Sequence, residues 1–285
     1  MKSMLRTALF LLLASIHLVA PAHAEDLEMV NRPVNTSGLT GLLFTTAPYT
    51  QPSGKLEIGA SILTENSVKP EYRITEYPLS VTVGLKNNSE MALRGSYFNI
   101  KEGPTDTATT HRQTGDIELS YKWNFMPQPE YSSIPAIALI ITGSAPTEKI
   151  SAKKMNSLAH WGVKIGLSTG TEVIWKEHVL GIYADAYLAG QDLTEQRLRD
   201  LYEIMNAGLL LPISKYRNLQ MFMEYTLVHG KDFISLSGGD YSSFTYGVRL
   251  ASERFNLTIG TEFLHKKPEN FDNSGRVSGL MSIKL

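Results

Sequence analysis

The sequence predicts an all-β fold, an antiparallel transmembrane β-barrel of about twelve strands, and two observations support it. From residue 55 onward, apolar and polar residues alternate in segments of about ten residues, as in strands with one apolar face. After residue 24, no apolar run approaches the ~18 to 20 residues that a membrane helix needs. Only helices and closed barrels satisfy every backbone polar group in lipid, so a membrane-embedded chain of this kind must be a barrel.

The alternation locates the strands. In "DIELSYKWNF" at 116–125, Ile117, Leu119 and Tyr121 lie on one side and polar residues on the other, and "LQMFMEYTL" at 219–227 repeats the pattern. Ten or fourteen strands also fit the sequence. The twelve expected strands lie near 55–64, 73–85, 89–99, 114–125, 134–143, 157–168, 179–188, 200–211, 218–229, 241–251, 254–264 and 276–285.

The connections between these segments alternate in length. Short ones, "KNNS" at 86–89 and "SER" at 252–254, alternate with longer polar ones such as 101–113 and 230–240. Short turns at one end and long loops at the other are typical of outer-membrane barrels. The segment 126–134 is an exception, because it is rather long for the side of the short turns.

A soluble sandwich or lipocalin would show the same alternation with its faces exchanged. Twelve strands of about ten residues would then enclose a wide apolar interior, whereas ~9 to 11 tilted residues match the thickness of a bilayer. The final segment, "RVSGLMSIKL", alternates up to Leu285 and is expected to pair with the first strand and close the barrel. It resembles the assembly signal of such barrels, which usually ends in Phe or Trp.

Residues 1–24 have the pattern of a secretory signal peptide. Lys2 and Arg6 precede an apolar run from Ala8 to Ala20, and Ala22-His23-Ala24 provides an A-x-A cleavage site. The chain has no cysteine, which excludes disulfides and a lipid-modified cysteine. Its 27 basic and 28 acidic residues indicate no nucleic-acid partner. We therefore expect export through the inner membrane and a place in a Gram-negative outer membrane.

The lumen is predicted to be lined by balanced charge if the apolar faces contact lipid. Eight acids and eight bases then point inward, which indicates ion-pair networks and a narrow, weakly selective or plugged passage. Glycines within the strands are interpreted as relieving crowding inside a small barrel. The predicted lumen-lining residues are Lys55, Glu57, Glu90, Arg94, Asp116, Glu118, Lys122, Lys164, Asp185, Glu203, Glu224, Arg249, Arg254, Glu262, Arg276 and Lys284.

Aromatic residues recur near the ends of the expected strands, which suits girdles at the two membrane interfaces. They are Tyr97, Trp123, Phe125, Trp175, Tyr216, Tyr241, Phe255 and Phe263.

The stretch before the first strand carries a family resemblance. "NTSGLTGLLFTTAPYTQPSGKLEIGASI" at 35–62 resembles the leading segment of YjbH-type outer-membrane proteins, which are associated with exopolysaccharide production. Gly38, Leu39, Gly41, Leu42, Gly54 and Leu56 match that pattern, and residues 77–98 add a weaker similarity. The order of proline and alanine at 45–48 departs from it, and the chain is much shorter than a full YjbH-type protein. The resemblance implies an outer-membrane β-barrel in a polysaccharide context, and no catalytic residue.

The organisation expected is a signal peptide at 1–24, an N-terminal segment at 25–54 and a barrel at 55–285. Residues 25–54 are too broken for a membrane strand, so they form either a periplasmic clip or a plug within the lumen, and we favour the plug.

Enzymatic chemistry is weakly indicated. A lipid or lipopolysaccharide hydrolase would need a serine, a histidine and an acid near one rim, and the candidates are Ser157 with His160, and His111, His229 and His265. No serine lies in a G-x-S-x-G elbow, and no histidine spacing suits a metal. We expect no enzyme, no cofactor and no metal.

The function predicted is a passive pore or an envelope component linked to polysaccharide export. The alternatives are an outer-membrane hydrolase and a structural barrel without conductance. The expected partners are outer-membrane lipids and lipopolysaccharide, the barrel assembly machinery, and a polysaccharide or small solute.

Overall fold

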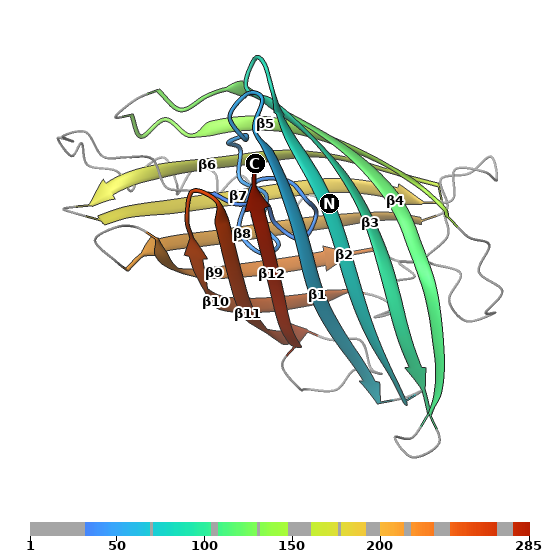
Figure 1. The fold of residues 1–285 in the computed structure, drawn as a ribbon. Helices are drawn as coiled ribbons and strands as arrows, with labels where there is room; N and C mark the ends of the chain where they lie inside the picture. Colours follow the sequence, from blue (N-terminus) through green and yellow to red (C-terminus); the bar gives the residue numbers. More distant parts are fainter. Residues whose placement is uncertain are drawn as a thin grey trace.

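The computed structural model describes residues 32–68, 71–103, 108–129, 132–147, 161–175, 178–191, 200–213, 218–230, 240–266 and 276–285. It confirms the predicted fold, a closed antiparallel barrel of twelve strands (Figure 1). The strands are β1 (Leu56–Val68), β2 (Glu71–Leu85), β3 (Ser89–Glu102), β4 (Thr109–Met126), β5 (Ala136–Ala145), β6 (Gly162–Trp175), β7 (His178–Gln191), β8 (Asp200–Pro212), β9 (Leu219–His229), β10 (Tyr241–Ala251), β11 (Phe255–Lys266) and β12 (Arg276–Lys284).

Each strand pairs with its neighbours along the chain, and β12 pairs with β1 to close the sheet. The closing register runs from Glu57 opposite Lys284 to Leu63 opposite Ser278. The C-terminal alternating segment therefore forms the expected seam, and the described sheet has no edge strand. No helix among the described residues is long and apolar enough to cross a membrane.

The two ends of the barrel differ. We call one the turn end, because β1 begins there, β12 finishes there, and the connections at 86–88 and 252–254 are short. The opposite end, the loop end, carries the longer connections, such as 146–161 and 230–240. One connection at the loop end is short, because β1 and β2 extend to Val68 and from Glu71.

Several strands extend further than the alternation indicated. The strand predicted at 114–125 begins at Thr109, and the one predicted at 157–168 runs from Gly162 to Trp175. Residues 109–112 are all polar and exposed, so this part of the strand has no apolar face. It therefore lacks the alternation that identifies a strand in the sequence.

The barrel is apolar outside, as a lipid-facing surface requires. On β9, Leu219, Met221, Met223 and Tyr225 are each at least 40% exposed, whereas the residues between them are buried inside. Aromatic side chains lie on the outer surface toward both ends, Trp123 near the turn end and Phe263 stacked on Tyr246 nearer the loop end. Tyr216 and the side chains of Trp175 and Tyr241 lie outside what the structure describes.

The assignment of faces on β12 can be tested with a pair of aspartates. Met281 is 45% exposed on the outer face, whereas Ser278 is 3% exposed on the inner face, two residues from Arg276. Met281→Asp should reduce the amount of folded barrel in the outer membrane, because a charge facing lipid costs on the order of 1–2 kcal/mol. Ser278→Asp should leave that amount near wild type.

Heat-dependent mobility of the two variants on denaturing gels measures the folded fraction. Equal yields of Met281→Asp and Ser278→Asp would overturn the assignment of faces.

Candidate functional site

Residues 32–54, which we call the inner segment, lie inside the barrel toward the turn end. In Figure 1 this blue stretch lies within the ring of strands beside the end of β12. Val34, Leu39, Leu42 and Leu43 are almost fully buried. The segment forms no strand and has only isolated bridges, Val34 to Thr40 and Gly41 to Thr46. Gly38 turns the chain with a φ of 84°, a conformation that glycine adopts at little cost.

Some N–H groups of this irregular, buried backbone donate to carbonyl oxygens within the inner segment itself, as Asn35 does to Leu39, and several others need partners from the barrel wall. Glu224 on β9 provides an acceptor for three consecutive amides. Its carboxylate accepts from the backbone nitrogen of Leu43 at 3.3 Å, of Phe44 at 3.0 Å and of Thr45 at 2.6 Å. Asp185 on β7 accepts the next amide, that of Thr46, and also the side-chain amide of Asn206.

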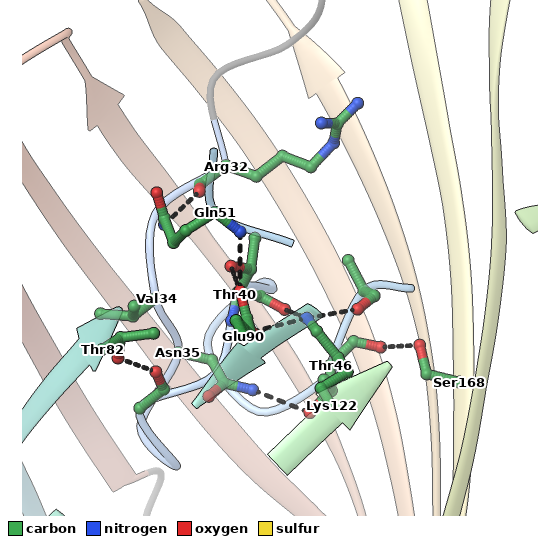
Figure 2. Close-up of polar contacts among 12 residues, drawn as sticks. Arg32, Val34, Asn35, Thr40, Thr46, Gln51, Thr82, Glu90, Lys122 and Ser168 are labelled. Atoms are coloured by element: carbon green, nitrogen blue, oxygen red, sulfur yellow. Dashed lines mark hydrogen bonds and ion pairs between the residues drawn. The ribbon is translucent and has the colours of Figure 1, made fainter. Parts of the chain in front are cut away.

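Glu90 on β3 and Lys122 on β4 form a second point of attachment (Figure 2). The Glu90 carboxylate accepts the backbone N–H groups of Thr40 and Gln51, both at 2.8 Å. Lys122 Nζ pairs with Glu90 at 2.8 Å and donates to the carbonyl oxygens of Ala47 at 2.9 Å and Thr40 at 3.2 Å. Both charged side chains are fully buried, so these bonds offset the cost of removing the two charges from water.

Glu57 joins the inner segment to the closing seam. It lies on β1 opposite Lys284 of β12. Its carboxylate accepts from the Val34 amide at 3.2 Å, from Gln51 Nε2 at 2.6 Å and from the hydroxyl of Ser282. Closure of the barrel and attachment of the inner segment therefore share one side chain.

Two polar groups of the inner segment form a cluster with β6 and β7. The Arg32 guanidinium pairs with Glu172 and lies 3.8 Å from the centre of the Tyr49 ring. Burial opposes the charge of Arg32, but Glu172 outweighs it and raises the pKa of Arg32. Burial also raises the pKa of the Tyr49 phenol, whose hydroxyl donates to Gln128. Gln128 lies in the long connection 127–135, which thus reaches the inner segment.

Glycines in the wall leave room for the inner segment. A Cβ at Gly84 would lie 2.1 Å from the carbonyl oxygen of Pro52. A Cβ at Gly208 would lie 2.4 Å from Leu42, and one at Gly260 would lie 2.8 Å from Leu43. Crowding does explain glycine here, but the crowding comes from the inner segment packed against the wall.

Apolar inward side chains complete the packing. Tyr183, Leu210, Phe222 and Leu280 belong to the same buried cluster as Leu42 and Leu43. Burying such side chains contributes roughly 1.5–3 kcal/mol each relative to exposure. The inner segment is therefore packed as a small hydrophobic core inside the barrel.

A cavity of about 330 Å³, which we call the vestibule, lies between the inner segment and the loop end. Leu39, Phe44 and Thr46 of the inner segment form its floor. Its wall comes from the loop-end halves of the strands, including Ile74, Lys164, Tyr187 and Arg276.

The predicted lumen residues fall into groups. Glu57, Glu90, Lys122, Asp185 and Glu224 are buried and bind the inner segment, and Arg94 donates to the carbonyl oxygen of Thr36 at 2.9 Å. Lys164, Glu262 and Arg276 line the vestibule. Asp116, Glu118 and Lys284 are partly buried. Arg249 is buried, and its Nε donates to the hydroxyl of Thr258 at 3.0 Å.

Three of these predicted positions are corrected by the structure. Glu203 on β8 faces outward, because its neighbours Tyr202 and Ile204 line the vestibule and its cross-strand partner Leu188 is 53% exposed on the outer face. Lys55 and Arg254 do not line the lumen, because they precede β1 and β11 in turns and are exposed. Each of these two residues lies one position before the first residue of its strand.

Sequence reasoning missed several neutral partners. The Thr82 hydroxyl donates to the carbonyl oxygen of Gly38, and the Ser168 hydroxyl donates to that of Thr46 at 2.8 Å (Figure 2). Tyr187 donates from its hydroxyl to Thr46 Oγ1 at 2.7 Å. Their only signal was an inward position on a strand, which short polar residues share with many others.

The candidate hydrolase residues are not assembled in the part of the chain that the structure describes. Ser157 and His160 lie outside it. His111, His229 and His265 are exposed. His229 Nδ1 is 2.9 Å from Asp240, and no described serine hydroxyl bonds to any of the three.

Comparison with known proteins gives a likeness in fold. No family model matches the chain, and no curated protein matches it. An outer membrane channel from Pseudomonas putida F1 superposes with a TM-score of 0.57 at 9% identity, covering 83% of this chain and 97% of the channel. LpxR from Salmonella typhimurium gives a TM-score of 0.53 at 11% identity, covering 81% of this chain and 99% of LpxR.

The β domain of the Bordetella autotransporter BrkA gives 0.51 at 9% identity, covering 82% of this chain and 100% of that domain. The chain has the fold of an outer-membrane β-barrel. The resemblance to YjbH-type proteins stays a prediction, because none of these comparisons bears on it.

The role of Glu224 can be tested with a cysteine reporter, since the chain has none of its own. Ala47 is 1% exposed, so a cysteine placed there should react slowly with a maleimide. Adding Glu224→Gln weakens three charge-assisted bonds and should speed that labelling about tenfold or more, at roughly 1.5–3 kcal/mol.

Glu262→Gln is the matched control, because Glu262 pairs with Arg276 and has no bond to the inner segment. Labelling is followed by mass spectrometry. Equal rates in the two variants would contradict the attachment through Glu224.

The glycine contacts predict a difference between two alanine variants. Gly84→Ala places a methyl group against the backbone of Pro52 and should lower stability by about 1–3 kcal/mol. Gly95→Ala meets nothing within 4 Å and should be neutral or stabilising. Thermal unfolding of both proteins in detergent compares them, and an unchanged midpoint for Gly84→Ala would refute the close contact.

Proposed function

We propose that the protein is a non-enzymatic outer-membrane pore that the inner segment closes and that admits small solutes when this segment is displaced. In this proposal the turn end faces the periplasm and the loop end faces outside, as the lengths of the connections favour. Residues 1–24 act as a cleaved signal peptide, and the barrel assembly machinery inserts the barrel among lipids and lipopolysaccharide.

The observation that supports this proposal most is the way the lumen is filled. The inner segment occupies the lumen toward the turn end, and the vestibule lies on its other side. Every contact that the structure describes between this segment and the wall is non-covalent, and one short stretch of chain connects the segment to β1. Such an attachment can be released without opening the strand ladder.

The alternatives make different demands. A hydrolase would need a serine and histidine together at the rim, and the described residues offer no such pair. A structural barrel would keep the inner segment in place permanently and would carry no current.

A second candidate is an envelope component associated with polysaccharide production. The observation that favours it is that five of the six residues carrying the YjbH resemblance belong to the inner segment, namely Gly38, Leu39, Gly41, Leu42 and Gly54. If the inner segment is a family feature, this barrel serves a polysaccharide pathway. A role in a polysaccharide pathway is compatible with the proposed pore.

A disulfide latch tests the pore. Val34 Cγ2 lies 3.0 Å from the position that a Cβ at Gly59 would occupy. This is about the 3 Å that separates a disulfide sulfur from the partner Cβ. The double variant Val34→Cys, Gly59→Cys should therefore fix the inner segment to β1.

In planar bilayers, the oxidised double variant should be silent and should show step-like openings after reduction. Val34→Cys alone should give the same currents with and without the reductant. Currents that do not depend on oxidation of the double variant would show that the inner segment is no gate. The absence of current in the wild type and in the reduced variant would reject the pore.

A further inference from the structure

The wall of the vestibule is unusually apolar for the inside of a membrane barrel. Val228 on β9, Ile204 on β8 and Tyr187 on β7 stand directly opposite one another across consecutive strand pairs. They form one arc along the wall, and all three line the cavity. Inward positions of a water-filled channel are normally polar, and apolar surface facing water raises the free energy of the empty cavity.

Most of the charge around the vestibule is already paired. Glu76 pairs with Arg94 at 2.5 Å, and Glu262 pairs with Arg276 at 3.6 Å. These pairs neutralise the carboxylates that face the cavity.

Lys164 differs from these residues. It lies on β6, one strand from Tyr187, and its ammonium is 5.9 Å from the centre of the Tyr187 ring. Among the described residues, its ammonium has no hydrogen bond or ion pair. Glu118 on β4 attracts it electrostatically, but the Glu118 carboxylate is shared with Arg94 at 3.5 Å. The apolar arc thus ends at an ammonium group whose donors are available.

We infer that the vestibule binds a monoanionic solute with a compact apolar body, its carboxylate on Lys164 and its body along Tyr187, Ile204 and Val228. The volume of about 330 Å³ is at the lower end of the range for small-molecule sites. A neutral polar solute would leave the apolar arc without a partner, and a cation would be repelled by Lys164.

The bound solute would rest against the inner segment. Tyr187 contributes both to the arc and to the hydrogen bond with Thr46. The inferred ligand is also the class of solute that the proposed pore would admit, and its passage rests on that proposed function. Binding itself does not depend on the pore.

The test uses 2-naphthoate with the full-length protein in detergent and measures binding by equilibrium dialysis. Lys164→Met keeps the length of the side chain but removes the charge, so the affinity for 2-naphthoate should fall about tenfold or more. The neutral analogue 2-naphthylmethanol should bind both proteins equally. Lys101→Met, an exposed lysine on β3 outside the cavity lining, is the matched control and should bind 2-naphthoate as the wild type does.

A second variant guards against a misfolded Lys164→Met, and heat-dependent gel mobility checks folding of each. Ile204→Trp fills the arc and should abolish binding of both compounds. No binding of 2-naphthoate to the wild type would overturn the inference, as would equal affinity in wild type and Lys164→Met. Dialysis measures binding and no current, so its outcome is separate from that of the bilayer experiment. Binding of 2-naphthoate by a barrel that carries no current would reject only the pore. Current through a barrel that does not bind 2-naphthoate would reject only this site.

Discussion

The structure depends on buried carboxylates that accept backbone amides of the inner segment. Glu57, Glu90, Asp185 and Glu224 come from four separate strands, and each carboxylate accepts at least one N–H group of residues 34–51. Without regular secondary structure, the inner segment satisfies only part of its own backbone, so the wall must supply acceptors for further buried amides. Lys122 provides the complementary donor for two of its carbonyl oxygens.

This arrangement explains two features that are costly on their own. Ionised side chains buried in a lumen are unfavourable unless hydrogen bonds surround them, and the inner segment supplies those bonds. Glycine within strands weakens a sheet, but at Gly84 and Gly208 it allows the inner segment to approach the wall. The wall and the inner segment therefore stabilise each other.

The fold was predictable because alternation along β9 and β12 reflects a physical boundary between lipid and lumen. The sequence also placed Glu90, Lys122 and Glu224 on the inner face. The sequence could not show that these three side chains bind backbone groups, because it does not mark which backbone amides need a partner. The balanced charges instead suggested ion pairs between strands. No role could be predicted for the inward side chains of Phe222 and Leu280, because they belong to one buried cluster with Leu42 and Leu43, which lie far away in the chain.

Amide hydrogen exchange of the full-length protein in detergent tests the central claim most directly. If wall carboxylates hold the inner segment, the amides of Thr40, Leu43, Phe44, Thr45 and Gln51 should exchange as slowly as those of neighbouring strands. Exchange of these amides at the rate of an unstructured peptide, while β3 and β9 stay protected, would contradict the account.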